Sequence, residues 1–484
     1  MMYSSITVDS EFINHTSNRN KKCLKYATPN EEREISSLWR REILDEEEMD
    51  PTEVKVNNLP AIEPLKVYRI RWFILTLFVL FSASNSMQWI QYSIIANVIT
   101  QYYNVSTTWV DWTSIIYMVL YIPFIFPGSY LLDKLGLRVA IILGISGTCI
   151  GAWIKVLSVA PDRFYIGFLG QSIVALSQVF VLSVPARLAA VWFGPSQVSS
   201  ACSIGVFGNQ LGVATGFLVP PLLVNSKGSS DEIQHDLFIL FLGVAIFTTV
   251  LFVAIFLFFK NEPPTPPSYA QAQQNEAPVD FIGSLKRLLL NVPYVLLLLA
   301  YGINVGIFYA ISTLLNQIIL QYYEDAEADA GRIGVLIVFA GMLGSVMCGI
   351  ILDKFHRFKE TTVAVYAMSL VSMVIYTFAL DKGMVHVYVV SALLGFFMTG
   401  LLPVGFELAA ELTYPEPEGT SAGLLNAASQ VFGTAFTSLY SVIFHHFNDT
   451  WANAIMSVML LIGTILTVCI TSDLRRQAAQ ISKS

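Results

Sequence analysis

The chain has 484 residues, of which 54% are hydrophobic and 13% are charged, and its formal net charge is −7. A water-soluble protein could not bury so much apolar material in its cores, so we expect the chain to lie in a bilayer. The sequence contains no glycine-rich phosphate loop, no nucleophile–histidine–acid arrangement and no HExxH motif. We therefore expect no enzymatic activity, no cofactor, no metal site and no nucleic-acid partner.

The segment 1–65 is polar and precedes all the apolar stretches. It carries eight Lys/Arg against thirteen Asp/Glu, including three consecutive Glu at 46–48. It lacks the apolar core of a cleavable signal peptide, so the first membrane helix is expected to act as an uncleaved anchor. We expect this segment to form a disordered acidic tail in the cytosol.

Twelve apolar stretches follow this tail. A hydrocarbon core about 30 Å thick requires about 20 apolar residues per helix. The stretches that meet this requirement lie at 72–98, 111–132, 138–159, 163–190, 198–224, 237–259, 293–320, 332–352, 362–380, 384–412, 419–446 and 451–471.

The loop charges indicate the orientation of these helices. Fifteen of the twenty Lys and Arg residues after residue 65 fall on one side of the membrane, which the positive-inside rule assigns to the cytosol together with both termini. Two glycosylation sequons, at Asn104 and Asn448, fall in short loops on the opposite side. We expect both asparagines to be glycosylated.

A proline-rich segment divides the membrane body into two bundles. We expect a first bundle at 66–260, a flexible cytosolic linker with two Pro-Pro pairs at 261–290, a second bundle at 291–472 and a short cytosolic tail at 473–484.

The two bundles form an internal repeat. One constant offset, applied without a gap, places the Gln-Tyr-Tyr at 101–103 on 321–323 and the Leu-Asp-Lys at 132–134 on 352–354. Six helices per half is an even number, so the two halves have the same orientation. We therefore expect an all-α membrane protein with the major facilitator superfamily fold, built from two parallel six-helix repeats.

The substrate site of this fold lies near the bilayer midplane between the halves, so polar and aromatic residues at helix centres are the candidates. Under the same offset, Trp89 corresponds to Tyr309 and Gln210 to Gln430; Asn85 lies one turn before Trp89. Each of them could instead only pack or join helices. Their paired placement favours a role in lining the pathway, because a pseudo-twofold axis brings equivalent positions to one cavity.

The middle third of every predicted helix lacks Asp, Glu, Lys and Arg. An anionic substrate would find no basic partner there. A poorly hydrated organic cation could sit between the faces of Trp89 and Tyr309, where cation–π attraction is worth about 2 kcal/mol or more once water is excluded. A neutral aromatic solute would fit the same place.

The cytosolic loops after the second and eighth helices resemble the signature loop of the superfamily, which locks the cytosolic face closed. The first copy has Ser129 where glycine is usual, so tight helix contact there is less secure. Arg187 and Glu407 occupy equivalent positions with opposite charge and could pair across the halves in one conformation. The expected gating residues are Asp133, Arg138, Asp353, Arg357, Arg187 and Glu407.

Seven motifs resemble the feline leukaemia virus subgroup C receptor-related family, and the likeness extends from about residue 68 to residue 476. The resemblance implies a plasma-membrane facilitator of choline, and of ethanolamine, in which a Trp and a Tyr cage the ammonium while glutamines and an asparagine complete the pocket. The motifs lie at 88–94, 192–195, 208–212, 312–317, 395–400, 413–427 and 472–476.

Three functions are consistent with the sequence. The first is a uniporter of choline-like cations that acts as a monomer in the plasma membrane. The second is haem export, the older assignment of the family, although no histidine lies at a predicted helix centre. The third is a receptor or sensor that does not transport. Residence in mitochondria or another organelle is an alternative location.

Overall fold

The computed structural model describes residues 66–194, 197–267, 281–355, 357–414, 416 and 418–471. The predicted acidic tail at 1–65 and the C-terminal tail at 473–484 lie outside the described residues, as does the middle of the linker. Within the described ranges the chain forms helices, turns and loops and no strands.

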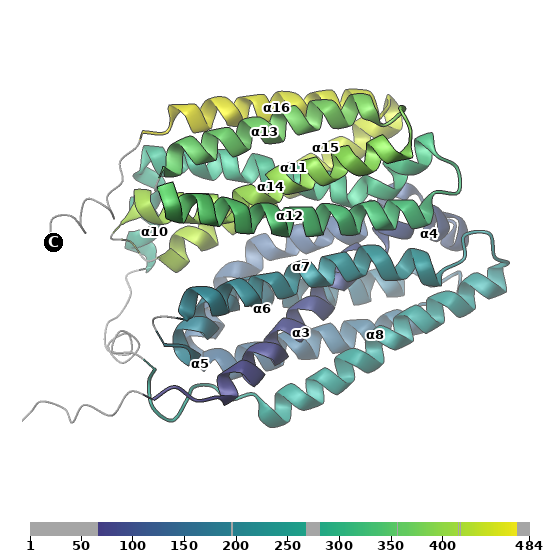
Figure 1. Cartoon of the computed structure of the whole chain (residues 1–484). Helices are drawn as coiled ribbons and strands as arrows, with labels where there is room; N and C mark the ends of the chain where they lie inside the picture. Colours follow the sequence, from purple (N-terminus) through teal and green to yellow (C-terminus); the bar gives the residue numbers. More distant parts are fainter. Residues whose placement is uncertain are drawn as a thin grey trace, which may run out of the picture. The chain divides into compact units, whose positions relative to one another are not determined.

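The N-terminal half contains five long helices and a short one, together with a 3₁₀ turn (Figure 1). Gly136 divides α5 into two membrane spans, because its φ of +84° lies in the left-handed region that favours glycine. The elements are α3 (Ile70–Ile90), η2 (Ser93–Ile95), α4 (Ala96–Tyr103), α5 (Thr107–Leu157), α6 (Phe164–Trp192), α7 (Val198–Leu223) and α8 (Ser230–Phe258).

The C-terminal half begins with the short amphipathic helix α10 and continues with six long helices. In Figure 1 these helices, coloured from teal through green to yellow, gather beside those of the N-terminal half. The elements are α10 (Phe281–Leu290), α11 (Val292–Tyr322), α12 (Glu327–Phe355), α13 (Phe358–Ala379), α14 (Met384–Thr413), α15 (Glu418–His446) and α16 (Asp449–Cys469).

Eleven of the twelve predicted membrane helices are confirmed by their length and apolarity. Eleven spans in the described chain are long and apolar enough to cross a bilayer, with α3, η2 and α4 counted as one span and α5 as two. The twelfth helix, α15, has 29 residues and packs within the bundle against α11, but serines, threonines and a glutamine make it less apolar. Its polar residues are sheltered by neighbouring helices, so hydropathy alone understates it.

The repeat extends to the way the helices pack. α3 packs along α7 in the first half, and its equivalent α11 packs along α15 in the second. Small residues permit both close crossings. In α7 these are Gly208, Gly212 and Gly216; in α11 they are Gly302 and Gly306.

The two halves touch at one end of the helices. We call the ends near Asn104 and Asn448 the outer ends, following the charge pattern of the loops. At these ends Asn97 Nδ2 donates to Glu327 Oε1 at 2.9 Å, and Lys227 Nζ lies 2.7 Å from Asp325 Oδ2. The hydrogen bond to Asp325 raises the pKa of Lys227.

Closer packing joins the outer ends as well. α7 contacts α12 and α15 contacts α5, and a Cβ placed on Gly331 of α12 would lie 2.6 Å from the carbonyl oxygen of Phe217 in α7. At the opposite ends, the contacts between Arg71 and Gln197 and between Arg287 and Glu416 each stay within one half. The hydrogen bond from Arg287 lowers the pKa of Glu416. The structure therefore shows the transmembrane bundle with its outer ends closed together.

Candidate functional site

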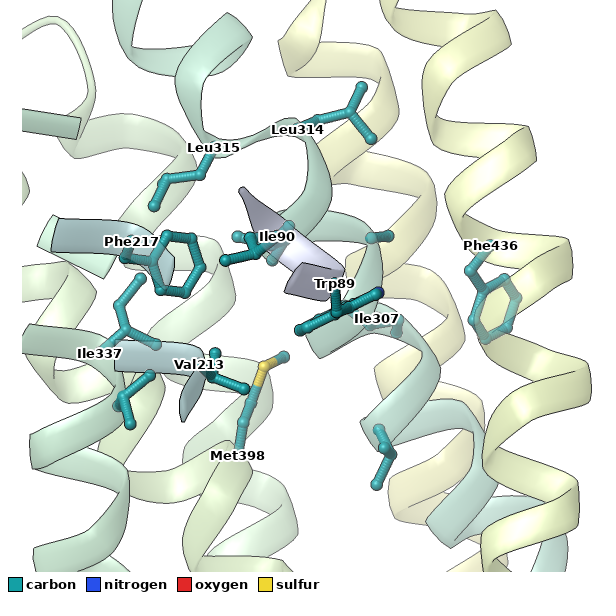
Figure 2. Close-up of a cluster of buried hydrophobic side chains, with 14 of the residues drawn as sticks. Trp89, Ile90, Val213, Phe217, Ile307, Leu314, Leu315, Ile337, Met398 and Phe436 are labelled. Atoms are coloured by element: carbon teal, nitrogen blue, oxygen red, sulfur yellow. The ribbon is translucent and has the colours of Figure 1, made fainter. Parts of the chain in front are cut away.

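Trp89 and Tyr309 meet where the two halves face each other. Their ring centroids are 5.4 Å apart and the rings are inclined at 71°, an edge-to-face contact. Trp89, near the end of α3, is 6% exposed. Figure 2 shows it among apolar side chains from both halves, with Val213 and Phe217 on one side and Phe436 on the other. The structure thus brings together the repeat-related aromatic pair, whose contact with a substrate stays a prediction.

Gln430 lies beside this pair. Its Nε2 donates to the hydroxyl of Tyr309 at 3.5 Å. Its Oε1 is buried and has no hydrogen-bond partner among the described residues. Amide groups buried in a membrane protein normally have hydrogen-bond partners. The free Oε1 of Gln430 is therefore an acceptor available to a ligand beside Tyr309.

The two other candidates, Asn85 and Gln210, make no hydrogen bond to Trp89 or Tyr309 among the described residues. Asn85 is fully buried, and its Nδ2 donates to Thr148 Oγ1 at 3.2 Å and to the carbonyl of Val174 at 3.0 Å. These bonds join α3, α5 and α6 within the N-terminal half. Gln210 in α7 is half-buried, while the adjacent Asn209 donates to Ser86 of α3. The substrate contacts of Asn85 and Gln210 stay predictions.

The first membrane helix is broken directly after Trp89, although the sequence predicts one continuous helix over 72–98. α3 ends at Ile90 and the chain passes through η2 into α4. Side chains satisfy two of the carbonyls that the break leaves without a helical partner. Ser114 Oγ donates to the Trp89 carbonyl at 3.1 Å, and Gln171 Nε2 donates to the Gln88 carbonyl at 2.8 Å. Broken helices within the membrane are tolerated where other protein groups cover them.

Lys155 is one of the five Lys and Arg residues after residue 65 that the loop charges place on the outer side, but the structure buries it. It is 1% exposed; its Nζ donates to Gln88 Oε1 at 2.9 Å and lies 5.5 Å from the ring centroid of Tyr92. The amide oxygen and the aromatic face stabilise the ammonium in place of water. Its long stem allows a residue at a helix end to reach inward, which hydropathy does not report.

The comparisons with known proteins agree with this architecture. The model of the Major Facilitator Superfamily matches residues 72–438. An uncharacterized MFS-type transporter of Caenorhabditis elegans is 53% identical over 422 residues, which are 86% of this chain and 72% of that protein. The choline/ethanolamine transporter flvcr2a of Danio rerio is 49% identical, covering 87% of this chain and 91% of that protein. The human choline/ethanolamine transporter FLVCR2 is 46% identical, covering 86% of this chain and 80% of that protein.

The chain belongs to the feline leukaemia virus subgroup C receptor-related family of the Major Facilitator Superfamily.

Solved structures share the fold of this transporter. A bacterial homologue of the human lysosomal transporter Spinster matches with a TM-score of 0.65 at 12% identity, over 85% of this chain and 99% of that one. The E. coli fucose:proton symporter FucP matches with a TM-score of 0.57 at 16% identity, over 84% of this chain and 100% of that one. The family confirms that the protein is a membrane transporter and not an enzyme.

The structure describes the side chains of some of the expected gating residues and not of others. Arg138 stays within its own half: its backbone N–H donates to Asn261 Oδ1 at 3.2 Å, and its guanidinium donates to the carbonyl of Phe256 at 3.0 Å. Arg357 is exposed at the start of α13. The side chains of Asp133 and Asp353 lie outside the described part of the structure. Their gating roles stay predictions.

Arg187 in α6 is half-buried and Glu407 in α14 is exposed, and both interact with neighbours. Their pairing across the halves also stays a prediction. Of the two predicted glycosylation sites, Asn104 is exposed in a left-handed turn after α4. Asn448 caps α16, where its Oδ1 accepts from the backbone of Trp451 at 3.0 Å. Among the described residues, no group of three or more His, Cys, Asp or Glu is placed to hold a metal ion.

Proposed function

We propose that this transporter is a facilitative uniporter of choline, with ethanolamine as a second substrate, and that Trp89 and Tyr309 bind the ammonium group. The observation that carries the proposal is the direct contact of these two rings across the halves. The names of the relatives, choline/ethanolamine transporters of fish and human, support the same substrates.

The contact between the rings indicates what binding requires. A cation held between two aromatic faces needs about 3.5–4 Å on each side, so the centroids would lie about 7 Å or more apart. At 5.4 Å the rings touch each other instead. The substrate would therefore part a contact between the halves, which links its binding to their relative movement.

Gln430 offers a reason for two substrates. A quaternary ammonium has no N–H group and is satisfied by aromatic faces alone. A primary ammonium has three N–H groups that need acceptors. Two groups supply such acceptors. One is the unpartnered Oε1 of Gln430. The other is the hydroxyl oxygen of Tyr309, which also accepts from Gln430 Nε2.

Uptake of labelled choline by cells expressing the protein tests the cage. We expect Trp89→Ala and Tyr309→Ala each to lower uptake about thirtyfold, because a desolvated cation–π contact is worth about 2 kcal/mol. Trp89→Phe, which keeps an aromatic face, should retain more uptake. Trp153→Ala is the matched control, since Trp153 lies in the same half with its side chain 41% exposed.

Two results would contradict this proposal. Normal choline uptake by both alanine variants at equal surface expression would remove the cage. Unchanged choline flux combined with increased cellular haem after loss of the protein would favour haem export instead.

Dependence on membrane potential tests the uniport mechanism. An inside-negative potential of 100 mV favours entry of a monovalent cation by about 2.3 kcal/mol, or about fiftyfold in accumulation. We expect proteoliposomes with an imposed potassium diffusion potential to accumulate choline to about this extent without sodium or proton gradients. Accumulation at zero potential that requires one of those gradients would instead show coupled transport.

A further inference from the structure

Asp111 is a buried carboxylate at the outer ends of the helices, where the two halves meet. It lies in α5 and is 0% exposed. Its Oδ1 accepts from Gln317 Nε2 at 2.6 Å, and its Oδ2 accepts from Ser441 Oγ at 2.5 Å. Both donors are neutral, and both belong to the C-terminal half.

Among the described residues, no Lys or Arg forms an ion pair with this carboxylate. Within the described part of the chain, His445 is the one basic side chain that lies within 4 Å, with its Nε2 at 3.9 Å from Asp111 Oδ2. The same nitrogen lies 3.1 Å from Thr107 Oγ1, nearer the outer surface. Burying a carboxylate whose donors are neutral costs folding free energy, and keeping it at this position is explained if its charge is used in transport.

The helices that surround Asp111 connect it to the aromatic pair. In α5, Met118 follows Asp111 by seven residues, or about 10 Å along the helix. A Cβ placed on Gly433 of α15 would meet both Met118 and the ring of Tyr309. Asp111 thus lies about two helical turns outward of the candidate site, on the same side of α5.

Two unpartnered hydroxyls lie between these levels. Thr313 is one turn outward of Tyr309 and one turn before Gln317 in α11, and Thr437 is one turn before Ser441 in α15. Both threonines are 0% exposed, and neither hydroxyl has a hydrogen-bond partner among the described residues. They leave free polar groups between the carboxylate and the rings.

Alternating access changes the partners of this carboxylate. Asp111 moves with the N-terminal half, whereas Gln317 and Ser441 move with the other half. When the outer ends part, both donors are withdrawn and the carboxylate faces the opening. An ammonium ion is the chemical group that best replaces them.

We propose that Asp111 is an outer binding site for the ammonium group of the substrate, occupied while the outer ends are apart. Gln317 and Ser441 replace the cation when these ends close, after it has moved inward to Trp89 and Tyr309. The inference rests on the proposed function, since it takes a small organic cation as the substrate. It adds an acidic site to a pathway whose helix centres carry no acid.

A role in closing the outer ends alone predicts the opposite effect on affinity. If Asp111 only held the halves together, its loss would populate the outward-open state and lower the KM measured from outside. If it captures the cation, its loss removes attraction at the mouth of the pathway and raises this KM by about tenfold or more. The sign of the change distinguishes the two roles.

The experiment measures the KM for choline that enters from the outer side, in the full-length protein. We expect Asp111→Asn to raise it about tenfold or more. Ser441→Ala, which removes one donor and keeps the charge, should leave it at or below the wild-type value. Inhibition by 3,3-dimethylbutan-1-ol, the uncharged isostere of choline, should not weaken in Asp111→Asn. Gln317→Arg is a second variant that places a tethered cation beside Asp111, and it should also raise the KM.

The outcomes separate this inference from the proposed function. Wild-type protein that moves no choline would overturn both. Wild-type transport with an unchanged or lower outer KM in Asp111→Asn and in Gln317→Arg would overturn the capture site alone. Equal weakening of choline and of its uncharged isostere in Asp111→Asn would also overturn it, because the charge would then be irrelevant.

Discussion

Gly331→Trp is expected to abolish transport while the protein remains folded in the membrane. Gly331 lies in α12 where it meets α7, and a Cβ there would be 2.6 Å from the carbonyl oxygen of Phe217 and 3.0 Å from Pro221. A tryptophan would keep the outer ends from closing. Overpacking by a few methylenes costs about 1–3 kcal/mol, and a whole indole ring against backbone atoms lies at or above the upper end, which shifts a two-state equilibrium about 150-fold or more. The atoms nearest to such a Cβ all belong to α7, so the clash lies between the halves and not within one of them.

Two measurements check this expectation. Choline flux should fall to background. A cysteine introduced at Thr313, which is 0% exposed here, should become reactive toward a membrane-impermeant thiol reagent in a background without the native cysteines. The control is Gly243→Trp, because a Cβ on Gly243 meets no atom within 4 Å. Gly331→Trp protein that transports like Gly243→Trp would show that the outer closure is not part of the cycle.

The aromatic pair shows what sequence alone can establish for a repeated fold. The constant offset between the halves relates Trp89 to Tyr309 without any contact information, and the structure places their rings 5.4 Å apart. Equivalent positions near a pseudo-twofold axis are neighbours by symmetry. The meeting of these residues could therefore be predicted, while the edge-to-face geometry depends on side-chain packing.

Asn85 shows where the same reasoning stops. Spacing of i, i+4 places it on the face of α3 that carries Trp89, but its amide turns to Thr148 and Val174 within the N-terminal half. A polar side chain in a membrane bonds to whichever partner is nearest. Those partners belong to α5 and α6, which are distant from α3 along the chain, so one helix cannot reveal them.

The buried charges were missed for a related reason. Asp111 and Lys155 lie near the ends of predicted spans, where a sequence places charges in loops or at the interface. The structure buries both. Gln317 and Ser441 donate hydrogen bonds to Asp111. Gln88 accepts one from Lys155, which also lies over the ring of Tyr92. The signal available in the sequence is the presence of Gln and Ser residues at the same depth in helices that are distant along the chain.

Gly212→Leu is expected to prevent stable folding of the N-terminal half. A Cβ on Gly212 would lie well inside van der Waals contact with the carbonyl oxygen and Cα of Ala83 in α3. Both are backbone atoms, so no rotamer change can relieve the overlap. The helices would have to separate along a contact that Gly208 and Gly216 also make. We expect a loss of about 3 kcal/mol or more, at the upper end of overpacking costs.

The thermal unfolding of detergent-solubilised protein measures this loss. Gly212→Leu should yield little monodisperse protein or a strongly lowered Tm, with Gly212→Ala intermediate. Gly243→Leu, on an exposed helix face with open space at its Cβ, should match the wild type. The equivalent crossing in the second half places the glycine on the opposite helix: Gly306 of α11 lies against the backbone of Phe432 in α15. If the close approach of the two helices is required for folding, Gly306→Leu should lower the Tm as much as Gly212→Leu does. A Tm equal to that of Gly243→Leu in either variant would show that the helix crossing at that glycine tolerates separation.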